Sequence, residues 1–321
     1  MVIQMELIKK LTEEFGVSGR EDKIRELIIS EIKPLCDEVT VDALGNVTGT
    51  IRGGEKIVAA AAHMDEIGVV ITYKSENGFL RFAAVGGLDT RHLVGRRVVF
   101  ENGTVGVIGS EKDNDKNQIS KMYIDVPSEC GVDVGDMACF EGEFHSFGSR
   151  VVSKALDNRL GCWILIEAMK KVKGAKNTLK FIFTAQEEVG LRGAKAAAFG
   201  CGAEAAVAVD VTDTGDTPEC SPMAVSLGGG AAVKIMDRSV ICHSEIRSAL
   251  IKLANENNIC YQLEVMTEGG TDAGSIHVSG SGIKTGGISV PVRYIHSPSE
   301  MADMKDAACC ANLLAAFMDE F

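Results

Sequence analysis

The chain has 321 residues, of which 45% are hydrophobic and 24% charged, and its formal net charge at pH 7 is −12. This length suits one large α/β domain or two domains with a sizeable core, and the composition is that of an ordinary globular protein. The acidic balance argues against a nucleic-acid partner and against binding to an anionic membrane surface, because both require an excess of lysine and arginine.

No segment of the sequence is expected to enter a membrane or the secretory pathway. The first 15 residues, MVIQMELIKKLTEEF, already combine helical periodicity with acidic residues, which is unlike a signal peptide. No apolar run approaches the ~18 residues that are needed to span a bilayer. The ten cysteines are scattered along the chain and form no C-x-x-C pair. We therefore expect reduced core thiols in a cytoplasmic protein and no thiolate zinc site.

The first 65 residues predict two helices, a pair of strands and a buried strand. Met5–Phe15 has the periodicity of an amphipathic helix, and Ser18-Gly-Arg-Glu21 resembles a capping box that opens a second helix through residues 24–32. Two alternating runs around Leu44-Gly45-Asn46 predict a hairpin-like strand pair. The continuous apolar run IVAAAAHMD, which starts at residue 57, suits a strand that is buried on both faces.

The hydrophobic pattern of the sequence changes between residues 70 and 152. Short alternating runs such as GVVITYK, FLRFAAV and TVGVIG, punctuated by Gly, Asn and Asp, replace the helical periodicity. This pattern predicts a small all-β unit, a barrel or a sandwich. We therefore expect a β-rich insertion at 70–152 that interrupts a main domain formed by 1–69 and 153–321.

After residue 153, strands alternate with helices to the end of the chain. The predicted helices, besides a short Ala-rich one, cover residues 158–172, 244–257 and 299–320. The predicted strands cover residues 179–185, 205–211, 261–267 and 287–296. Such alternation is typical of an α/β domain with a mostly parallel mixed sheet and helices on both faces.

Five segments end an apolar strand-like run, or begin a helix, with residues that can bind a cation. In an open α/β sheet, ligands gather at the carboxyl ends of the strands, so segments that are distant in sequence can converge there. These segments contain His63 with Asp65, Asp157, the pair Glu187-Glu188, Asp210, and His296.

Each of these residues also has an ordinary structural explanation. His63 could be a satisfied core histidine, and His296 could simply end a strand. Asp157 could be a helix N-cap, and Asp210 could lie in a turn. Paired glutamates are common on solvated helix faces, as we expect for Glu13-Glu14. Two histidines and three or four carboxylates at strand ends nevertheless favour one shared site over a set of unrelated caps and turns.

The charge balance of such a site suits two divalent cations. Three carboxylate ligands would offset three of the four positive charges, and a bridging hydroxide would offset the fourth. Imidazole and carboxylate without thiolate favour Zn²⁺, Co²⁺ or Mn²⁺. Two such ions that share a carboxylate and a water form a site for metal-assisted hydrolysis. The adjacent glutamates would then have different roles: one would bind metal, and the other would accept the proton of the bridging water.

Six motifs follow one another along the chain: HMDEIG (63–68), KALDNRLG (154–161), TAQEEVGLRGA (184–194), AVDVTDT (208–214), EGGTDAG (268–274) and TGGISVPVRYIHSPSEM (285–301). Together they resemble the tetrahedral (TET) aminopeptidases, the glutamyl aminopeptidase family of co-catalytic metallopeptidases. The resemblance spans nearly the whole chain, including the β insertion. It implies that His63 and Asp210 hold one metal, that Glu188 and His296 hold the other, and that Asp157 bridges both.

The resemblance also implies roles for two acidic residues that hold no metal. Glu187 would be the general base, which takes a proton from the metal-bridging water and later protonates the leaving amine. Asp65, two residues from His63 on the same strand face, would orient the imidazole. The implied reaction is hydrolysis of the N-terminal peptide bond, and the implied cofactors are two divalent metal ions, Zn²⁺ or Co²⁺ or else Mn²⁺.

The same resemblance implies how the protein assembles and what it cleaves. The β insertion would serve dimerisation, and the dimers would form a hollow tetrahedral dodecamer with inward-facing active sites. The substrates would be short peptides with a free N-terminus. Thr271 and Asp272 could line the cleft. LGGGAAVK (227–234) replaces the Gly-Lys-Gly-Pro-like turn of the family in a loop expected near the substrate.

Two other functions are compatible with parts of the pattern. A glycoside hydrolase that uses the paired glutamates would need carboxylates about 5–9.5 Å apart on opposite sides of the bond, which sequence neighbours do not easily provide. One Trp and 5% aromatic residues also leave little to stack on sugars. A non-catalytic assembly protein would have no need for the complete set of ligands and base. Metal content and amino-acid release from unblocked and N-blocked peptides separate the three functions.

Overall fold

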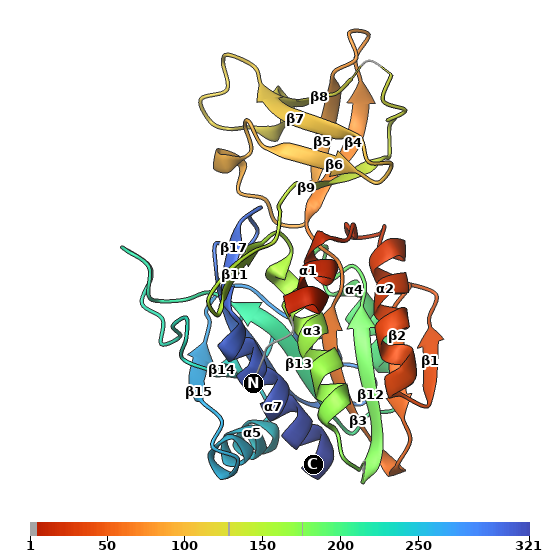
Figure 1. The fold of residues 1–321 in the computed structure, drawn as a ribbon, viewed down its shortest axis with the longest axis vertical. Coiled ribbons are helices and arrows are strands. Elements are labelled where there is room, and N and C mark those ends of the chain that lie inside the picture. Colours follow the sequence, from red (N-terminus) through yellow and green to blue (C-terminus); the bar gives the residue numbers. More distant parts are fainter. Residues whose placement is uncertain (1–4, 128, 175) are drawn as a thin grey trace.

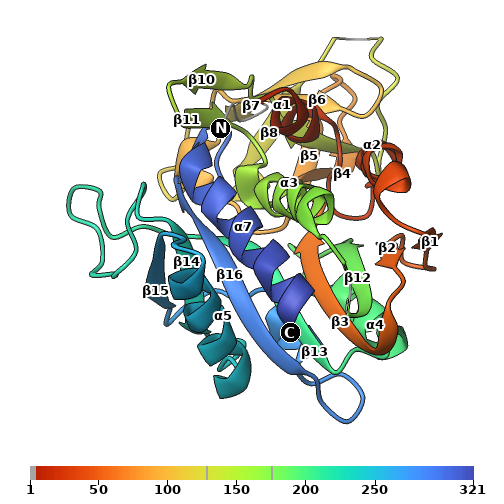
Figure 2. The same cartoon turned by 60° about the horizontal axis from the view of Figure 1, so that its bottom comes forward.

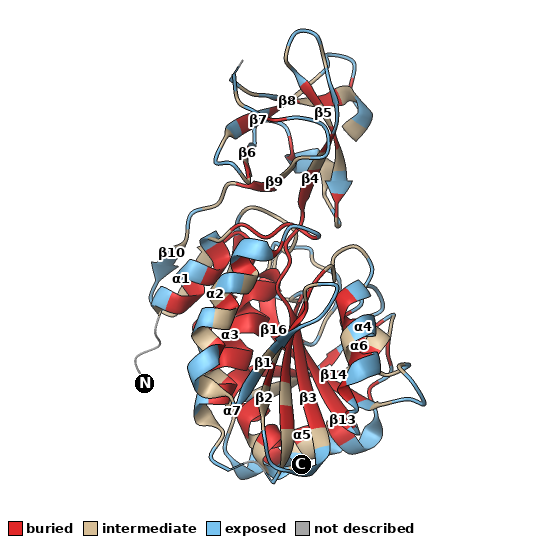
Figure 3. Cartoon of the chain, turned by 90° about the vertical axis from the view of Figure 1, so that its right-hand side faces the viewer, coloured by how far each residue is buried: buried red, intermediate tan, exposed pale blue. Residues whose placement is uncertain are grey.

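In the computed structural model, a large mixed β-sheet carries helices on both faces, and a separate β-barrel stands at one end of it (Figures 1 and 3). The structure describes residues 5–127, 129–174 and 176–321. This arrangement confirms the predicted α/β fold with a barrel-like insertion. Residues 1–4, which begin the N-terminal stretch that is unlike a signal peptide, lie outside the described residues.

The large sheet has parallel strands at its centre and antiparallel strands towards both edges. Its main path runs in the order β1 (Glu38–Val41), β2 (Val47–Ile51), β12 (Asn177–Thr184), β3 (Gly54–His63), β13 (Ala205–Thr212), β16 (Lys284–Arg293), β17 (Glu300–Asp303), β11 (Arg150–Ser153) and β10 (His145–Phe147). Beside β16, β14 (Ala231–Met236) pairs with β15 (Tyr261–Val265). The strands from β12 to β16 on this path are parallel, so their carboxyl ends meet at one edge.

Strand β3 is buried on both faces, which explains why its sequence is apolar without alternation. It pairs in parallel with β12 on one side and with β13 on the other. Ala60 and Ala62 pack into the large core on one face of the sheet, while Ala59 and Ala61 pack into a smaller core on the other face. Because successive side chains of a strand point to opposite faces, both faces of β3 need apolar residues.

Helices cover both faces of the sheet (Figures 2 and 3). One face carries α1 (Met5–Glu13), α2 (Asp22–Ile32), α3 (Leu156–Lys171), α5 (Ser244–Glu256) and α7 (Met304–Glu320). The other face carries α4 (Arg192–Cys201) and the short α6 (Ala273–Ile276). Short 3₁₀ helices are η1 (Lys33–Leu35), η2 (Thr90–His92) and η3 (Ile119–Lys121). Among the described residues, no helix combines the length and apolarity that crossing a bilayer requires.

The barrel is closed and has its own core. Its strands follow the order β4 (Gly68–Lys74), β5 (Leu80–Val85), β8 (Met122–Asp125), β7 (Val105–Ser110), β6 (Arg97–Phe100) and β9 (Met137–Phe140). Val69, Ile71, Phe82 and Phe100 are among the side chains that fill it. Strand β10 and most of β11 also fall within residues 70–152, yet they belong to the large sheet: β11 pairs with β17 at its edge, and β10 pairs with β11.

The predicted capping box is wrong. Helix α2 begins at Asp22, and Glu21 at its N-cap makes no capping hydrogen bond. Ser18 Oγ donates instead to Asp65 Oδ2 at 2.5 Å, and Glu21 Oε1 accepts from Gln186 N at 3.2 Å. Both side chains are therefore engaged by loops near the sheet's carboxyl edge, so they do not cap the helix.

Two strands of the large sheet, β17 and β14, were not predicted. Residues 300–303 were expected in the last helix, but they form β17, which pairs with β11 and β16. Helix α7 begins only at Met304, with Asp303 as its N-cap and a hydrogen bond from Lys305 N to Asp303 Oδ1 at 3.0 Å. Strand β14 follows directly on the glycines of the segment LGGGAAVK, which was interpreted as a turn.

Asp306 in α7 fixes that glycine-rich segment in place. Its two carboxylate oxygens accept from Gly228 N at 2.7 Å and from Gly230 N at 2.8 Å. Both glycines have a φ of +89°, which other residues adopt only with strain. The backbone thereby turns from the loop into β14 and positions the strand's side chains.

The carboxyl of Asp306 predicts a pH dependence of stability. Burial raises its pKa to about 6, although the two glycine N–H groups act in the opposite direction. Because the pKa is higher in the folded than in the unfolded state, its contribution to stability is present below about pH 4 and is lost as the pH rises through about 6. Asp306→Asn should therefore show a smaller loss of stability than the parent protein between pH 4 and 7, measured by urea unfolding with chelator present. Parallel pH profiles would contradict this assignment.

Candidate metal centre

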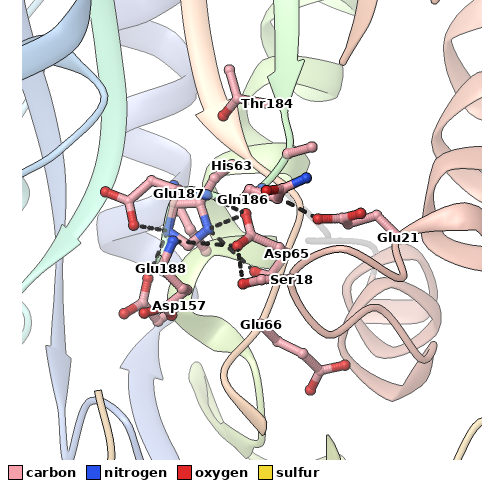
Figure 4. A network of polar contacts seen from close by, with 12 residues as sticks. Ser18, Glu21, His63, Asp65, Glu66, Asp157, Thr184, Gln186, Glu187 and Glu188 are labelled. Atoms are coloured by element: carbon pink, nitrogen blue, oxygen red, sulfur yellow. Dashed lines mark hydrogen bonds and ion pairs between the residues drawn. The ribbon is translucent and has the colours of Figure 1, made fainter. Parts of the chain in front are cut away.

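The candidate residues meet at the carboxyl edge of the parallel strands, and Figure 4 shows His63, Asp65, Asp157, Glu187 and Glu188 among them. His63 is the last residue of β3, Asp210 lies within β13, and Glu187-Glu188 follow the end of β12. Asp157 approaches from the first turn of α3, and His296 from the turn between β16 and β17. The structure thus brings together side chains from five separate segments, as expected for this edge of the sheet.

His63 presents one ring nitrogen to a group of carboxylates. Its Nε2 lies 3.2 Å from Asp157 Oδ1, 3.6 Å from Asp210 Oδ1 and 3.8 Å from Glu187 Oε2. Its Nδ1 lies on the other side, 3.2 Å from the Asp65 carbonyl oxygen and 3.5 Å from Asp65 Oδ1. The ring is 2% exposed, so it is held in this orientation with Nε2 towards the acidic cluster.

Asp157 lies between the two histidines. Its Oδ1 is 3.2 Å from His63 Nε2, and its Oδ2 is 3.3 Å from His296 Nε2. The same nitrogen of His296 is 3.2 Å from Glu188 Oε2. The N-cap of α3 is Ala155, and beyond it Gly161 N donates to Asn158 Oδ1, so Asp157 is not a helix N-cap. A carboxylate with one oxygen directed to each side is the arrangement that a residue shared between two cations requires.

Two overlapping groups of side chains could each hold a cation. His63, Asp157 and Glu188 form one group, and His63, Glu187 and Asp210 form the other, with the ligand atoms of each group within 4.8 Å of one another. The second group includes Glu187, so distance alone does not separate a metal ligand from a base at this position.

The donor set fits divalent cations. Glu188 Oε1 is buried and has no hydrogen-bond partner. Burial raises the pKa of Glu188 to about 7, with a further contribution from Asp157, and burial likewise raises the pKa of Glu187 well above its usual value. Buried carboxylates that repel one another and lack hydrogen-bond donors are stabilised by a cation. Oxygen and imidazole donors without sulfur suit the zinc, cobalt or manganese ions expected from the sequence.

Asp65 connects His63 to the two glutamates. Its carboxylate accepts from Glu187 N at 3.0 Å, from Glu188 N at 3.2 Å and from Ser18 Oγ at 2.5 Å. Strand β3 ends at His63, so Asp65 lies beyond the strand, and its predicted place on the same strand face is wrong. The fully buried carboxylate nevertheless lies against the imidazole, where it can orient the ring.

Glu300 is a buried residue of the site that was not predicted from the sequence. Its Oε2 accepts from Asp157 N and its Oε1 from His296 N, each at 2.9 Å. One carboxylate therefore fixes the backbone of two candidate ligands that come from different elements. Its place in the same motif as His296, four residues later, is the only sequence signal that points to it.

Glu300→Gln should destabilise the metal-free protein by about 1–3 kcal/mol, because one of two buried N–H groups then loses its acceptor. It should also weaken cation binding, because Asp157 and His296 are no longer fixed. Urea unfolding and titration with Co²⁺ measure the two effects. Glu26→Gln, on the exposed side of α2, is the matched control. Unchanged stability together with unchanged affinity for Co²⁺ would contradict this role.

A cavity of about 520 Å³ opens beside the cluster. This volume lies within the range of small-molecule sites and can take a short peptide. Thr271 lines it, as expected, whereas Asp272 lies behind the wall and accepts from Thr184 Oγ1 at 2.5 Å. The wall includes six of the seven candidate side chains: His63, Asp157, Glu187, Glu188, Asp210 and His296.

Comparison with known proteins gives consistent results over the whole chain. Residues 45–313 match the family model described as M42 glutamyl aminopeptidase. A relative from Acetivibrio thermocellus that carries the name "Putative aminopeptidase" is 52% identical over 318 residues, with 96% of each chain covered. The solved structure of aminopeptidase APDkam598 from the archaeon Desulfurococcus kamchatkensis has a TM-score of 0.95 and 36% identity over 98% of this chain and 94% of that one. Pyrococcus horikoshii TET1 peptidase, which is described as assembling into a tetrahedron or a large octahedral shell, has a TM-score of 0.89 and 35% identity over 99% of both chains.

Proposed function

The chain belongs to the M42 glutamyl aminopeptidase family, and on this basis we propose that it is a metal-dependent aminopeptidase that removes N-terminal residues from short peptides. The observation that carries the proposal is the position of Asp157 between His63 and His296, with further carboxylates around them at the wall of a peptide-sized cavity. No arrangement of this kind is needed by a protein that only assembles.

In this proposal two divalent cations occupy the cluster. His63 and Asp210 hold one, Glu188 and His296 hold the other, and Asp157 is shared. When bound, such ions supply positive charge that polarises the scissile carbonyl and increases the acidity of water. The unpartnered oxygen of Glu188 and the raised pKa of its carboxyl support this assignment.

Glu187 moves the proton in this proposal. It takes a proton from the attacking water and delivers it to the nitrogen of the leaving amine. Burial raises its pKa, which brings the carboxyl closer to the range in which a general base works near neutral pH. The hydrogen bond from its backbone N–H to Asp65 Oδ1, at 3.0 Å, holds the residue at the cavity wall. Asp65 thus positions both His63 and the base.

The charge of the cavity wall supports the proposed requirement for a free N-terminus. The N-terminal amine of a peptide is a cation near neutral pH, and blocking it removes the charge. Asp213, next to β13, adds a carboxylate to the wall beyond the proposed metal ligands. An acidic wall attracts a positively charged free amine, whereas an acylated amine is neutral and has no such attraction to it.

The barrel is proposed to mediate assembly. In this proposal the insertion at 70–152 forms the dimer contact, 1–69 and 153–321 form the catalytic domain, and dimers build a tetrahedral dodecamer. Pyrococcus horikoshii TET1 peptidase is described as assembling into a tetrahedron or a large octahedral shell. Exposed apolar side chains on the barrel, among them Tyr73, Val105 and Val107, support a contact surface there. Light scattering after size-exclusion chromatography measures the assembled mass.

The test of function compares peptides with and without a blocked N-terminus. Protein is stripped with a chelator and then reloaded with Zn²⁺, Co²⁺ or Mn²⁺ in separate samples. We expect release of the first residue only after reloading and only from the unblocked peptide. Equal cleavage of an N-acetylated peptide, or full activity of the stripped protein, would refute the proposal.

A further inference from the structure

A second group of buried charges lies in the wall of the same cavity. Lys234, in β14, is 1% exposed, and its ammonium forms an ion pair with Glu264 of the neighbouring strand β15. Its Nζ also lies 3.5 Å from Asp237 Oδ2. The two strands pair so that Lys234 stands directly beside Glu264. Lys234 and Asp237 both line the cavity, together with Met266.

The position of the lysine is built into the sheet. Gly287 lies opposite Lys234 on strand β16. A Cβ atom at Gly287 would lie 2.9 Å from Lys234 Cβ and 3.1 Å from Lys234 Cδ, so the glycine leaves the room that the lysine stem occupies. Lys234 is therefore a fixed part of the cavity wall and differs from a mobile surface lysine.

The acidic partners outnumber the lysine. Asp237 Oδ1 accepts three hydrogen bonds from residues 239 and 240, while its Oδ2 faces Lys234 without a hydrogen bond. Glu264 is fully buried. Burial alone lowers the pKa of Lys234, but Glu264 and Asp237 outweigh burial and raise it, so the ammonium stays charged. One positive and two negative charges leave a formal charge of −1 on the group.

We propose that the group formed by Lys234, Asp237 and Glu264 makes the cavity select peptides that begin with a basic residue over those that begin with an acidic one. This inference rests on the proposed aminopeptidase function. An acidic side chain would meet a lysine that is already neutralised and a surplus carboxylate, whereas a basic side chain is attracted by that surplus. Asp213, also in the wall, acts in the same direction. The half-buried Met266 offers apolar contact to a long aliphatic stem.

The first test compares single-residue chromogenic substrates on the metal-loaded protein. We expect kcat/KM for lysyl p-nitroanilide to exceed that for the glutamyl substrate by about tenfold or more, which corresponds to about 1.4 kcal/mol. Free lysine should likewise inhibit release from the leucyl substrate more strongly than free glutamate. A glutamyl substrate that is cleaved as fast as the lysyl one overturns the inference and leaves the proposed function standing. Release from no substrate at all overturns both.

The second test changes the charge of the group. Glu264→Gln leaves Lys234 with Asp237 alone and should lower the lysyl-to-glutamyl ratio by about tenfold. The matched control is Glu245→Gln, which removes a carboxylate from the exposed ion pair with Lys284 and should leave the ratio unchanged. A folded Glu264→Gln protein with the parent ratio overturns the inference. If Glu264→Gln does not fold, Asp237→Asn, which also removes one negative charge, takes its place with the same expected direction.

Discussion

Replacement of Glu187 by Gln is expected to lower kcat by about 10²–10⁴-fold, the range that general acid–base catalysis contributes, while both cations remain bound. Glutamine keeps the shape of the side chain and the hydrogen bond of the backbone N–H to Asp65, but its amide cannot accept and return a proton. The loss should therefore fall on turnover and leave the site intact.

The neighbouring glutamate provides the matched control for this experiment. Glu188→Gln should lose bound metal, because its carboxylate stands beside His296 and has an oxygen without any other partner. Metal content per subunit, measured by atomic spectroscopy, separates the two variants. Since Glu187 also lies within reach of His63 and Asp210, loss of metal in Glu187→Gln equal to that in Glu188→Gln would show that Glu187 is a ligand. Near-normal turnover would equally refute its role as the base.

Replacement of Asp157 by Asn should abolish peptide hydrolysis and reduce the stabilisation that added cations give. A ligand at 100 times its dissociation constant stabilises a folded protein by about 2.7 kcal/mol. Asparagine has a single acceptor oxygen, whereas each oxygen of Asp157 faces a different histidine. At least one of the two cation positions thereby loses a ligand, and the remaining amide N–H₂ is repelled by a cation.

The measurement is the rise in melting temperature when Zn²⁺ or Co²⁺ is added to the stripped protein. Using the rise rather than the melting temperature itself separates cation binding from any change in the stability of the metal-free fold. Asp115→Asn, at an exposed position in the barrel, should retain the full rise. The role of Asp157 would be wrong if its variant showed the same rise as the parent protein.

Most of the helices and central strands could be predicted because burial imposes their pattern. Strand β3 is apolar on both faces, and it was predictable from its run of alanines. Strand β17 was not, because residues 299–303 contain good helix formers and adjoin a true helix. Its pairing with β11, about 150 residues earlier in the chain, overrides that local preference.

The candidate ligands could be predicted because each stands at the end of an apolar run, and the topology brings such ends together. Residues that act on backbone groups could not be predicted in this way. Glu300 holds the site together by accepting hydrogen bonds from two backbone N–H groups. The direction of a backbone N–H depends on the folded chain, so it cannot be predicted from the sequence pattern. Ser18 and Glu21 have the composition of a cap, yet Asp65 and Gln186 engage them across large distances in sequence.

The attachment of the barrel bears on how proteins of this architecture diversify. Its entry strand β4 and its exit strand β9 are hydrogen-bonded neighbours, with Val69 opposite Ala138. The interior of the barrel is filled by its own apolar side chains, separate from those beneath the large sheet. Because the barrel enters and leaves the main domain at one point, recombination can lengthen, shorten or exchange it without displacing the large sheet. Natural variation can thus remodel the outer surface of the molecule while the chemistry beneath is inherited unchanged.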